Sequence, residues 1–167
     1  MSENEIINGL KEAMVAERTG IEFYTTAAER TSDPQGKQVF RQLAAEEQKH
    51  LEYLRNWYQQ LASNAVRPLT IDHSEIDLSG PSPIFSPELK SRINAAHWEM
   101  TALAVGLALE QASIERYRQL AVRAGSEPLR QFFNALVQWE ETHAVALQKQ
   151  FNYLREDYWH QAGFAPF

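Results

Sequence analysis

Apolar residues recur along this chain at intervals of three and four positions, the spacing that places them on one face of an α-helix. The pattern occupies four stretches, and between the second and the third it is lost among prolines and a glycine. Helix start signals agree with it, because Asp33 precedes Pro34 and Ser86 precedes Pro87. We predict a domain over 1–157 with helices over about 3–31, 34–63, 87–124 and 127–156, a connection over 64–86, and an aromatic tail over 158–167.

The lengths of the links predict how these helices pair. The links at Asp33 and Ser126 are too short to cross the length of a helix, so each joins two antiparallel neighbours. About 22 extended residues in the connection over 64–86 reach about 70 Å, whereas the helix before it is about 43 Å long. The connection can therefore run back along the bundle. The predicted fold is all-α, a four-helix bundle of two antiparallel hairpins joined by a long crossover loop.

Composition narrows the chemistry and the partners. The chain has 167 residues, which suits one domain with its own core, and no cysteine, which excludes disulfides and thiolate metal sites within it. The formal net charge of −6 argues against nucleic acid or an anionic membrane surface as a partner. The N-terminus shows no basic or apolar leader, and the apolar run Ala102–Leu109 is too short to span a bilayer. We expect a cytoplasmic protein.

Glutamates interrupt the apolar stripe of every predicted helix. Each occupies a position at which a core helix ordinarily carries Leu or Ile. Burying an ionised carboxylate without a partner costs several kcal/mol, so these side chains need cations or must take up protons. Cations would satisfy all of them together. The residues concerned are Glu17, Glu47, Glu110 and Glu140.

Histidines complete a ligand set. His50 follows Glu47 and His143 follows Glu140 by three positions, which places each pair on one helix face. Four helices that supply Glu, Glu-x-x-His, Glu and Glu-x-x-His can hold two metal ions in a bundle core. We therefore predict Glu17, Glu47, His50, Glu110, Glu140 and His143 as metal ligands.

The two halves of the chain repeat at an offset of 93 residues. Glu17 and Glu110 are related by it, as are Glu47 and Glu140. The repeat extends to apolar and aromatic positions, including the pair Tyr24 and Tyr117. It indicates a duplicated helix hairpin with a pseudo-twofold axis between the metals.

These motifs resemble the ferritin-like superfamily, and within it the rubrerythrin-type di-iron proteins, here without a rubredoxin domain. The resemblance implies two Fe ions, with Mn or Zn as alternatives, and makes Tyr24 and Tyr117 hydrogen-bond donors to the ligand carboxylates. It implies the reduction of hydrogen peroxide or O₂ with electrons from an external electron-transfer protein. Ser113 stands where rubrerythrins usually carry a further glutamate, so the six ligands are more similar to those of bacterioferritin. The motifs are Ala16-Glu17-x-x-x-Ile21-Glu22-x-Tyr24, Glu46-Glu47-Gln48-Lys49-His50, Leu109-Glu110-x-x-x-Ile114-Glu115-x-Tyr117 and Glu140-Glu141-Thr142-His143.

Two other functions fit the same sequence. One is a ferroxidase or iron-storage module, and the other is a helical interaction protein without turnover. The run Ala102–Leu109 is apolar around the whole helix, so we expect it to pack against a second subunit, in a homodimer or higher homo-oligomer, or against the crossover. The remaining charged residues of the motifs are expected at the surface, and three other histidines are expected to be structural. They are Glu22, Glu46, Glu115 and Glu141, and His73, His97 and His160.

Overall fold

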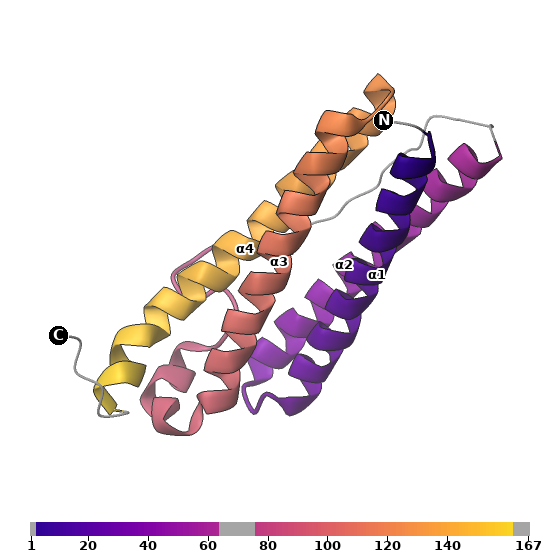
Figure 1. Cartoon of the computed structure of the whole chain (residues 1–167). Coiled ribbons are helices and arrows are strands. Elements are labelled where there is room, and N and C mark those ends of the chain that lie inside the picture. The colour runs from indigo at the N-terminus through magenta and orange to yellow at the C-terminus, as the bar shows by residue number, and fades with distance from the viewer. Residues whose placement is uncertain (1–2, 64–75, 162–167) are drawn as a thin grey trace.

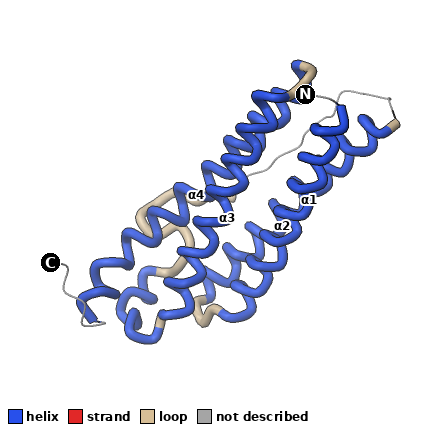
Figure 2. The backbone as a smooth tube through the Cα atoms, viewed as in Figure 1, coloured by secondary structure: helices blue, strands red, loops and turns tan. Residues whose placement is uncertain are grey.

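The computed structural model describes residues 3–63 and 76–161. The described residues form five helices and no strand (Figures 1 and 2). Helices α1 and α2 form one antiparallel hairpin and helices α3 and α4 form the other, which confirms the predicted all-α bundle of two hairpins. The bounds are α1 Glu3–Arg30, α2 Pro34–Ala62, η1 Pro87–Ala95, α3 His97–Arg123 and α4 Glu127–Gln161.

The turn between α1 and α2 is fixed by one buried carboxylate. Asp33 caps α2 by accepting a hydrogen bond from the Gly36 backbone N–H at 2.8 Å, and Pro34 occupies the first turn. Asp33 also accepts a hydrogen bond from the backbone N–H of Ser86 at 2.9 Å. The cap therefore joins the end of the crossover to the first hairpin.

The described part of the crossover, residues 76–86, is anchored on the bundle. Ile84 and Phe85 are completely buried, and Phe85 packs edge-on against Phe40 of α2. The buried Gln150 of α4 accepts hydrogen bonds at 2.9 Å from the backbone N–H groups of both Ile84 and Phe85. Residues 64–75 of the predicted connection lie outside the described residues.

The prediction of a single helix over 87–124 is wrong, because the structure has two helices there. Residues 87–95 form the 3₁₀-helix η1, in which Arg92 departs from helical geometry, and α3 starts at His97. A straight helix over 87–124 would be about 57 Å long, against about 42 Å for α1. It would carry Leu89 and Ile93 past the end of the first hairpin, whereas both are buried in the structure. Burial of these two residues accounts for the break.

Helix α4 extends to Gln161, further than the predicted end at 156, so the separate tail predicted from 158 is wrong at its start. The extra turn packs against its surroundings. Lys90 of η1 forms an ion pair with Asp157 at 3.2 Å, and Tyr158 lies 2.9 Å from His97 Nδ1. Residues 162–167 lie outside the described residues.

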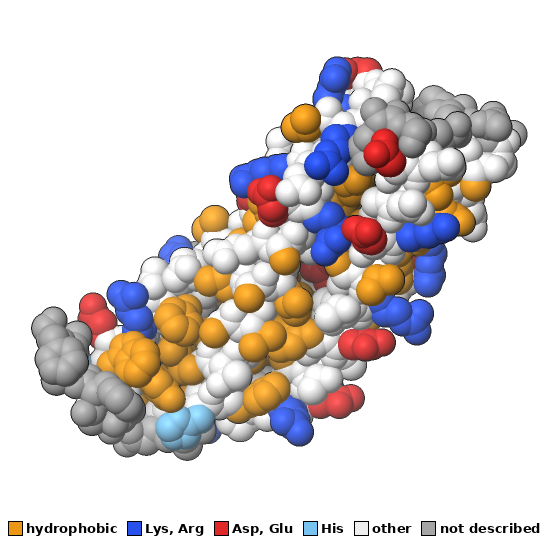
Figure 3. Space-filling model, in the orientation of Figure 1, with side chains coloured by type: hydrophobic (Ala, Val, Ile, Leu, Met, Phe, Trp, Pro, Cys, Tyr) orange, Lys and Arg blue, Asp and Glu red, His pale blue; other side chains and the backbone are white. Residues whose placement is uncertain are grey.

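The apolar core has two parts, and the polar stripe positions lie between them along all four helices. One cluster includes Phe40 and Leu103 and surrounds the buried part of the crossover. The other includes Leu54 and Phe133 and fills the opposite end. In Figure 3, apolar side chains gather on the half of the visible face that carries the start of α3 and the end of α4. Within the described residues, no helix has the length and apolar character of a membrane span.

Candidate metal centre

The middle of the bundle brings the six predicted ligands together. They come from all four long helices, and each is at most 4% exposed. The helical spacing of three residues turns both members of each Glu-x-x-His motif toward the same interior point. Glu17 comes from α1, Glu47 and His50 from α2, Glu110 from α3, and Glu140 and His143 from α4.

The six side chains form two overlapping groups that could each hold a metal ion. In each group the ligand atoms lie within 4.8 Å of one another. Glu47 and Glu140 belong to both groups, so they are the carboxylates placed to bridge two metals. The first group is Glu17, Glu47, His50 and Glu140, and the second is Glu47, Glu110, Glu140 and His143.

The imidazole nitrogens face the shared carboxylates. His50 Nδ1 lies 3.2 Å from Glu140 and 3.4 Å from Glu47. His143 Nδ1 lies 3.3 Å from Glu47 and 3.5 Å from Glu140. In each histidine, the nitrogen that a metal would use points toward the centre.

Two buried tyrosines repeat the pseudo-twofold relation. Tyr24 of α1 donates a hydrogen bond to Glu110 of α3, and Tyr117 of α3 donates one to Glu17 of α1. Burial and the neighbouring carboxylate raise the pKa of both phenols well above the usual range. Both hydroxyls therefore stay protonated at neutral pH and orient the two carboxylates that are not shared.

Several buried ligand atoms have no hydrogen-bond partner. They are Glu17 Oε2, Glu47 Oε1, both carboxylate oxygens of Glu140, and His143 Nδ1. Buried polar atoms are nearly always satisfied, so these atoms need a partner that is not a protein group. Carboxylate oxygen with imidazole nitrogen suits divalent iron, manganese or zinc. The residues present therefore fit a pair of metal ions.

The ionisable groups of the metal-free site shift one another's pKa. Burial, followed by the charges of the shared carboxylates, raises the pKa of Glu17 and of Glu110 well above the usual range. Burial opposes ionisation of Glu47 and Glu140 too, but the nearby histidines, together with Glu17 in the case of Glu47, lower their pKa. Burial likewise opposes protonation of the two histidines, yet the surrounding carboxylates raise their pKa. Among the six ligands, two ionised carboxylates then compensate two imidazolium ions.

Glu46 was predicted to be a surface charge, and this prediction is wrong. The side chain is 3% exposed, and its Oε2 lies 2.7 Å from His143 Nε2. Its Oε1 accepts a hydrogen bond from the backbone N–H of Ile76 at 2.8 Å. Glu46 thus connects the crossover to a predicted ligand. The signal in the sequence was its spacing from Leu43 and His50, by three and four positions on one helix face.

The two histidines differ in their surroundings. The residue related to Glu46 by the offset of 93 is Trp139. The His50 ring stacks on that indole, with 5.3 Å between ring centroids and 13° between planes. The two halves of the site therefore repeat the ligands and the tyrosines, but they differ in the group that contacts each histidine.

The other glutamates of the motifs and the other described histidines lie away from the six predicted ligands. Glu22 and Glu115 are exposed, and Glu141 is partly exposed and forms an ion pair with Arg118. His97 contacts Tyr158, and His160 is exposed. His73 lies outside the described residues.

A family model described as Rubrerythrin matches residues 8–150. This range contains all six predicted ligands and both tyrosines. Neither the search of curated proteins nor the search of solved structures gave a match.

Proposed function

Because the chain belongs to the rubrerythrin family, we propose that it is a di-iron oxidoreductase that reduces hydrogen peroxide or O₂ with electrons from an external donor protein. The observation that carries the proposal is the pair of overlapping ligand groups that share Glu47 and Glu140. When bound there, two iron ions supply the two electrons that reduction of a peroxide requires.

The protein's own residues prepare the site for this reaction. Four carboxylates and two imidazoles from four helices would hold two cations, at a place where each ligand side chain is at most 4% exposed. The hydroxyls of Tyr24 and Tyr117 orient Glu110 and Glu17. The carboxylate of Glu46 holds the ring of His143.

The electron donor and the assembly are parts of the same proposal. These 167 residues contain no cysteine, so they cannot ligate an iron–sulfur or thiolate iron centre of their own. An external electron-transfer protein in the cytoplasm would deliver the electrons. Three residues of the apolar run of α3 are exposed, which supports a homodimer or higher homo-oligomer. They are Ala104, Val105 and Ala108.

The test begins with elemental analysis, for which we expect two irons per chain. The reduced, iron-loaded protein is then mixed with hydrogen peroxide without O₂, and its oxidation is followed by absorbance. We expect faster oxidation than in Glu110→Ala, and wild-type rates in Glu115→Ala, since Glu115 is exposed on the same helix. Equal rates in wild type and Glu110→Ala would refute the proposal.

A further inference from the structure

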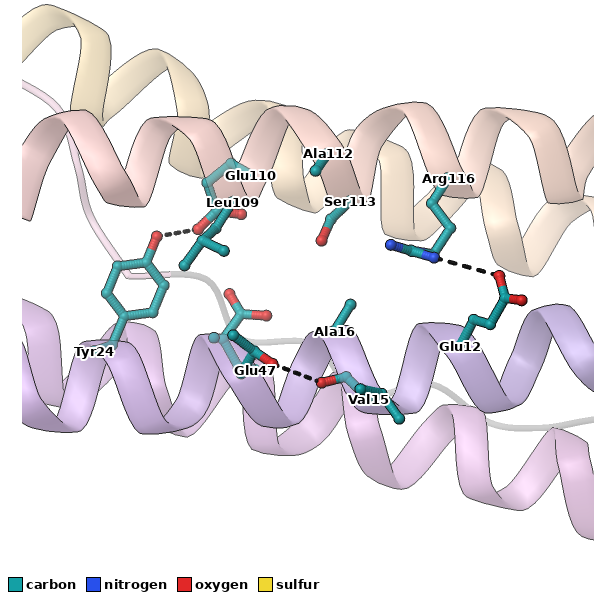
Figure 4. A pocket seen from close by; sticks show the side chains of 12 residues that line it. Glu12, Val15, Ala16, Tyr24, Glu47, Leu109, Glu110, Ala112, Ser113 and Arg116 are labelled. Carbon is teal, nitrogen blue, oxygen red and sulfur yellow. Dashed lines mark hydrogen bonds and ion pairs between the residues drawn. The ribbon is translucent and has the colours of Figure 1, made fainter.

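A pocket reaches the metal centre from one side, between α1 and α3 (Figure 4). Its inner end is formed by Glu47, Glu110 and Tyr24, and its walls are mainly small or aliphatic, with Val15 and Leu109 among them. The volume is about 440 Å³. Small-molecule sites span roughly 300–1,000 Å³, whereas one water molecule occupies about 30 Å³. Hydrogen peroxide and O₂, with two heavy atoms each, use little of this space.

The groove between α1 and α3 crosses the pseudo-twofold axis, because the offset of 93 relates residues on its two walls to one another. These pairs are Ala16 with Leu109, Thr19 with Ala112, and Gly20 with Ser113. The two ends of the groove differ, since Arg116 at one end is related to Phe23 at the other. Phe23 packs into the first core cluster, and a Cβ atom added at Gly106 of α3 would lie 3.4 Å from its ring. One end of the groove is therefore filled by an aromatic ring, and the end at Arg116 is left open.

The open side carries a cation with spare hydrogen-bonding capacity. Arg116 is the single cationic residue among those that line this pocket, all of which are described. Its ion pair with Glu12 is long, at 3.6 Å, and Glu12 is 72% exposed. The Nε of Arg116 is buried and has no hydrogen-bond partner. In Figure 4 the guanidinium and Ser113 lie on the α3 side of the pocket, facing α1. An incoming carboxylate can pair with this guanidinium while Glu12 turns outward.

From these observations we propose that the pocket binds an organic hydroperoxide that carries a carboxylate, with its apolar body along the pocket and its peroxide at the metal centre. Glu110 and Arg116 are six residues apart, or about 9 Å along α3. This distance suits a carboxylate separated from the peroxide by several carbons. The assignment rests on the proposed function, and it names the substrate class of that same site.

The reaction is a two-electron reduction. The O–O bond of the hydroperoxide breaks, one oxygen stays on carbon as an alcohol, and the other leaves as water. The external donor of the proposed function supplies the two electrons, and two protons from solvent complete the alcohol and the water. No other co-reactant is needed.

The first test measures binding without turnover. Zinc-loaded protein is titrated with octanoate in a calorimeter, and with acetate to correct for a carboxylate that binds only the metal. We expect octanoate to bind at least tenfold more tightly than acetate, and Arg116→Gln or Ser113→Leu to reduce this preference by about tenfold or more. Gln111→Leu is the control, because Gln111 is exposed on α3, lies outside the apolar run Ala102–Leu109 and does not line the pocket. Equal affinities for octanoate and acetate, or equal effects of Ser113→Leu and Gln111→Leu, would overturn the proposal.

The second test measures oxidation of the reduced, iron-loaded protein by an eight-carbon hydroperoxy carboxylate and by hydrogen peroxide. We expect the ratio of the two second-order rate constants to favour the organic peroxide, and to fall about tenfold in Arg116→Gln but not in Gln111→Leu. Oxidation by hydrogen peroxide with no preference for the organic peroxide would overturn this inference and leave the proposed function standing. Octanoate binding with no oxidation by either peroxide would overturn the proposed function, and the hydroperoxide assignment with it.

Discussion

Loading the metal-free protein with two divalent cations should release close to four protons at pH 6. The raised pKa values of Glu17 and Glu110 keep both carboxyl groups protonated in the metal-free site. The raised pKa values of His50 and His143 keep both rings cationic at this pH. A carboxyl or imidazolium group must lose its proton before it can bind a metal ion, so each of these four groups gives up one.

Charge balance supports the same number. Two divalent cations bring four positive charges into the buried site, and the release of four protons removes four. The net charge of the buried site is then unchanged. Each released proton makes the binding constant rise by a factor of ten per pH unit. The overall association constant for two cations should therefore rise roughly ten-thousandfold per pH unit near pH 6.

The assay is a titration of metal-free protein with Zn²⁺ in unbuffered solution, with base added to hold the pH and so count protons. Glu17→Gln should lower the count to about three, because an amide carries no titratable proton. Glu22→Gln, exposed on the same helix, should leave it at four. A wild-type count of two or fewer would mean that the unshared carboxyl groups are already ionised, and would refute the charge assignment.

Three further predictions concern stability and the groups around the ligands. The melting temperature of the metal-free protein should fall as the pH rises from about 6 to 9. A group whose pKa is higher in the folded than in the unfolded protein stabilises the fold, and that stability is lost as the pH rises through the folded-state pKa. Scanning calorimetry checks this prediction, with metal-loaded protein, whose melting temperature should change little, as the control. Glu46→Gln should weaken binding of the metal ion in the group that contains His143 by about 10–100-fold, because Glu46 contacts the ring of that ligand. A competitive chelator titration measures the affinity, with Glu22→Gln as control. Gly36→Ala should destabilise the protein by about 1–3 kcal/mol in urea, since its Cβ would lie 2.3 Å from the Phe85 ring, whereas Gly125→Ala has open space.

The sequence predicted the fold and the ligand positions because both depend on periodicity. A glutamate within an apolar stripe, and a histidine three residues after it, are visible without knowledge of which helix faces which. Duplication strengthened the pattern, since each of these features occurs twice. Which carboxylates are shared could not be predicted in this way, because sharing depends on how four helices approach one point. The structure identifies Glu47 and Glu140 from distances alone.

Features that depend on tertiary packing were missed. The break between η1 and α3 is absent from the apolar periodicity, because helical spacing continues through it from Leu89 and Ile93 to Ala96 and Met100. Their burial against the rest of the bundle decides where the chain bends. Glu46 was missed for a related reason. A charged residue beside a predicted ligand is ordinarily exposed, and only the described end of the crossover, through the Ile76 N–H, reveals why this one is buried.

The departures from the repeat divide the centre into two unequal halves. The pocket is lined by Glu110 and Glu47 but not by Glu17, so it opens toward the group that contains His143. That histidine is the one held by Glu46, which is in turn bonded to the crossover. The other group has its histidine stacked on Trp139. Duplication therefore accounts for two ligand groups of the same composition, whereas the differences at two related pairs, Glu46 with Trp139 and Phe23 with Arg116, distinguish their surroundings. Of the two unshared carboxylates, Glu110 lines the pocket and Glu17 does not.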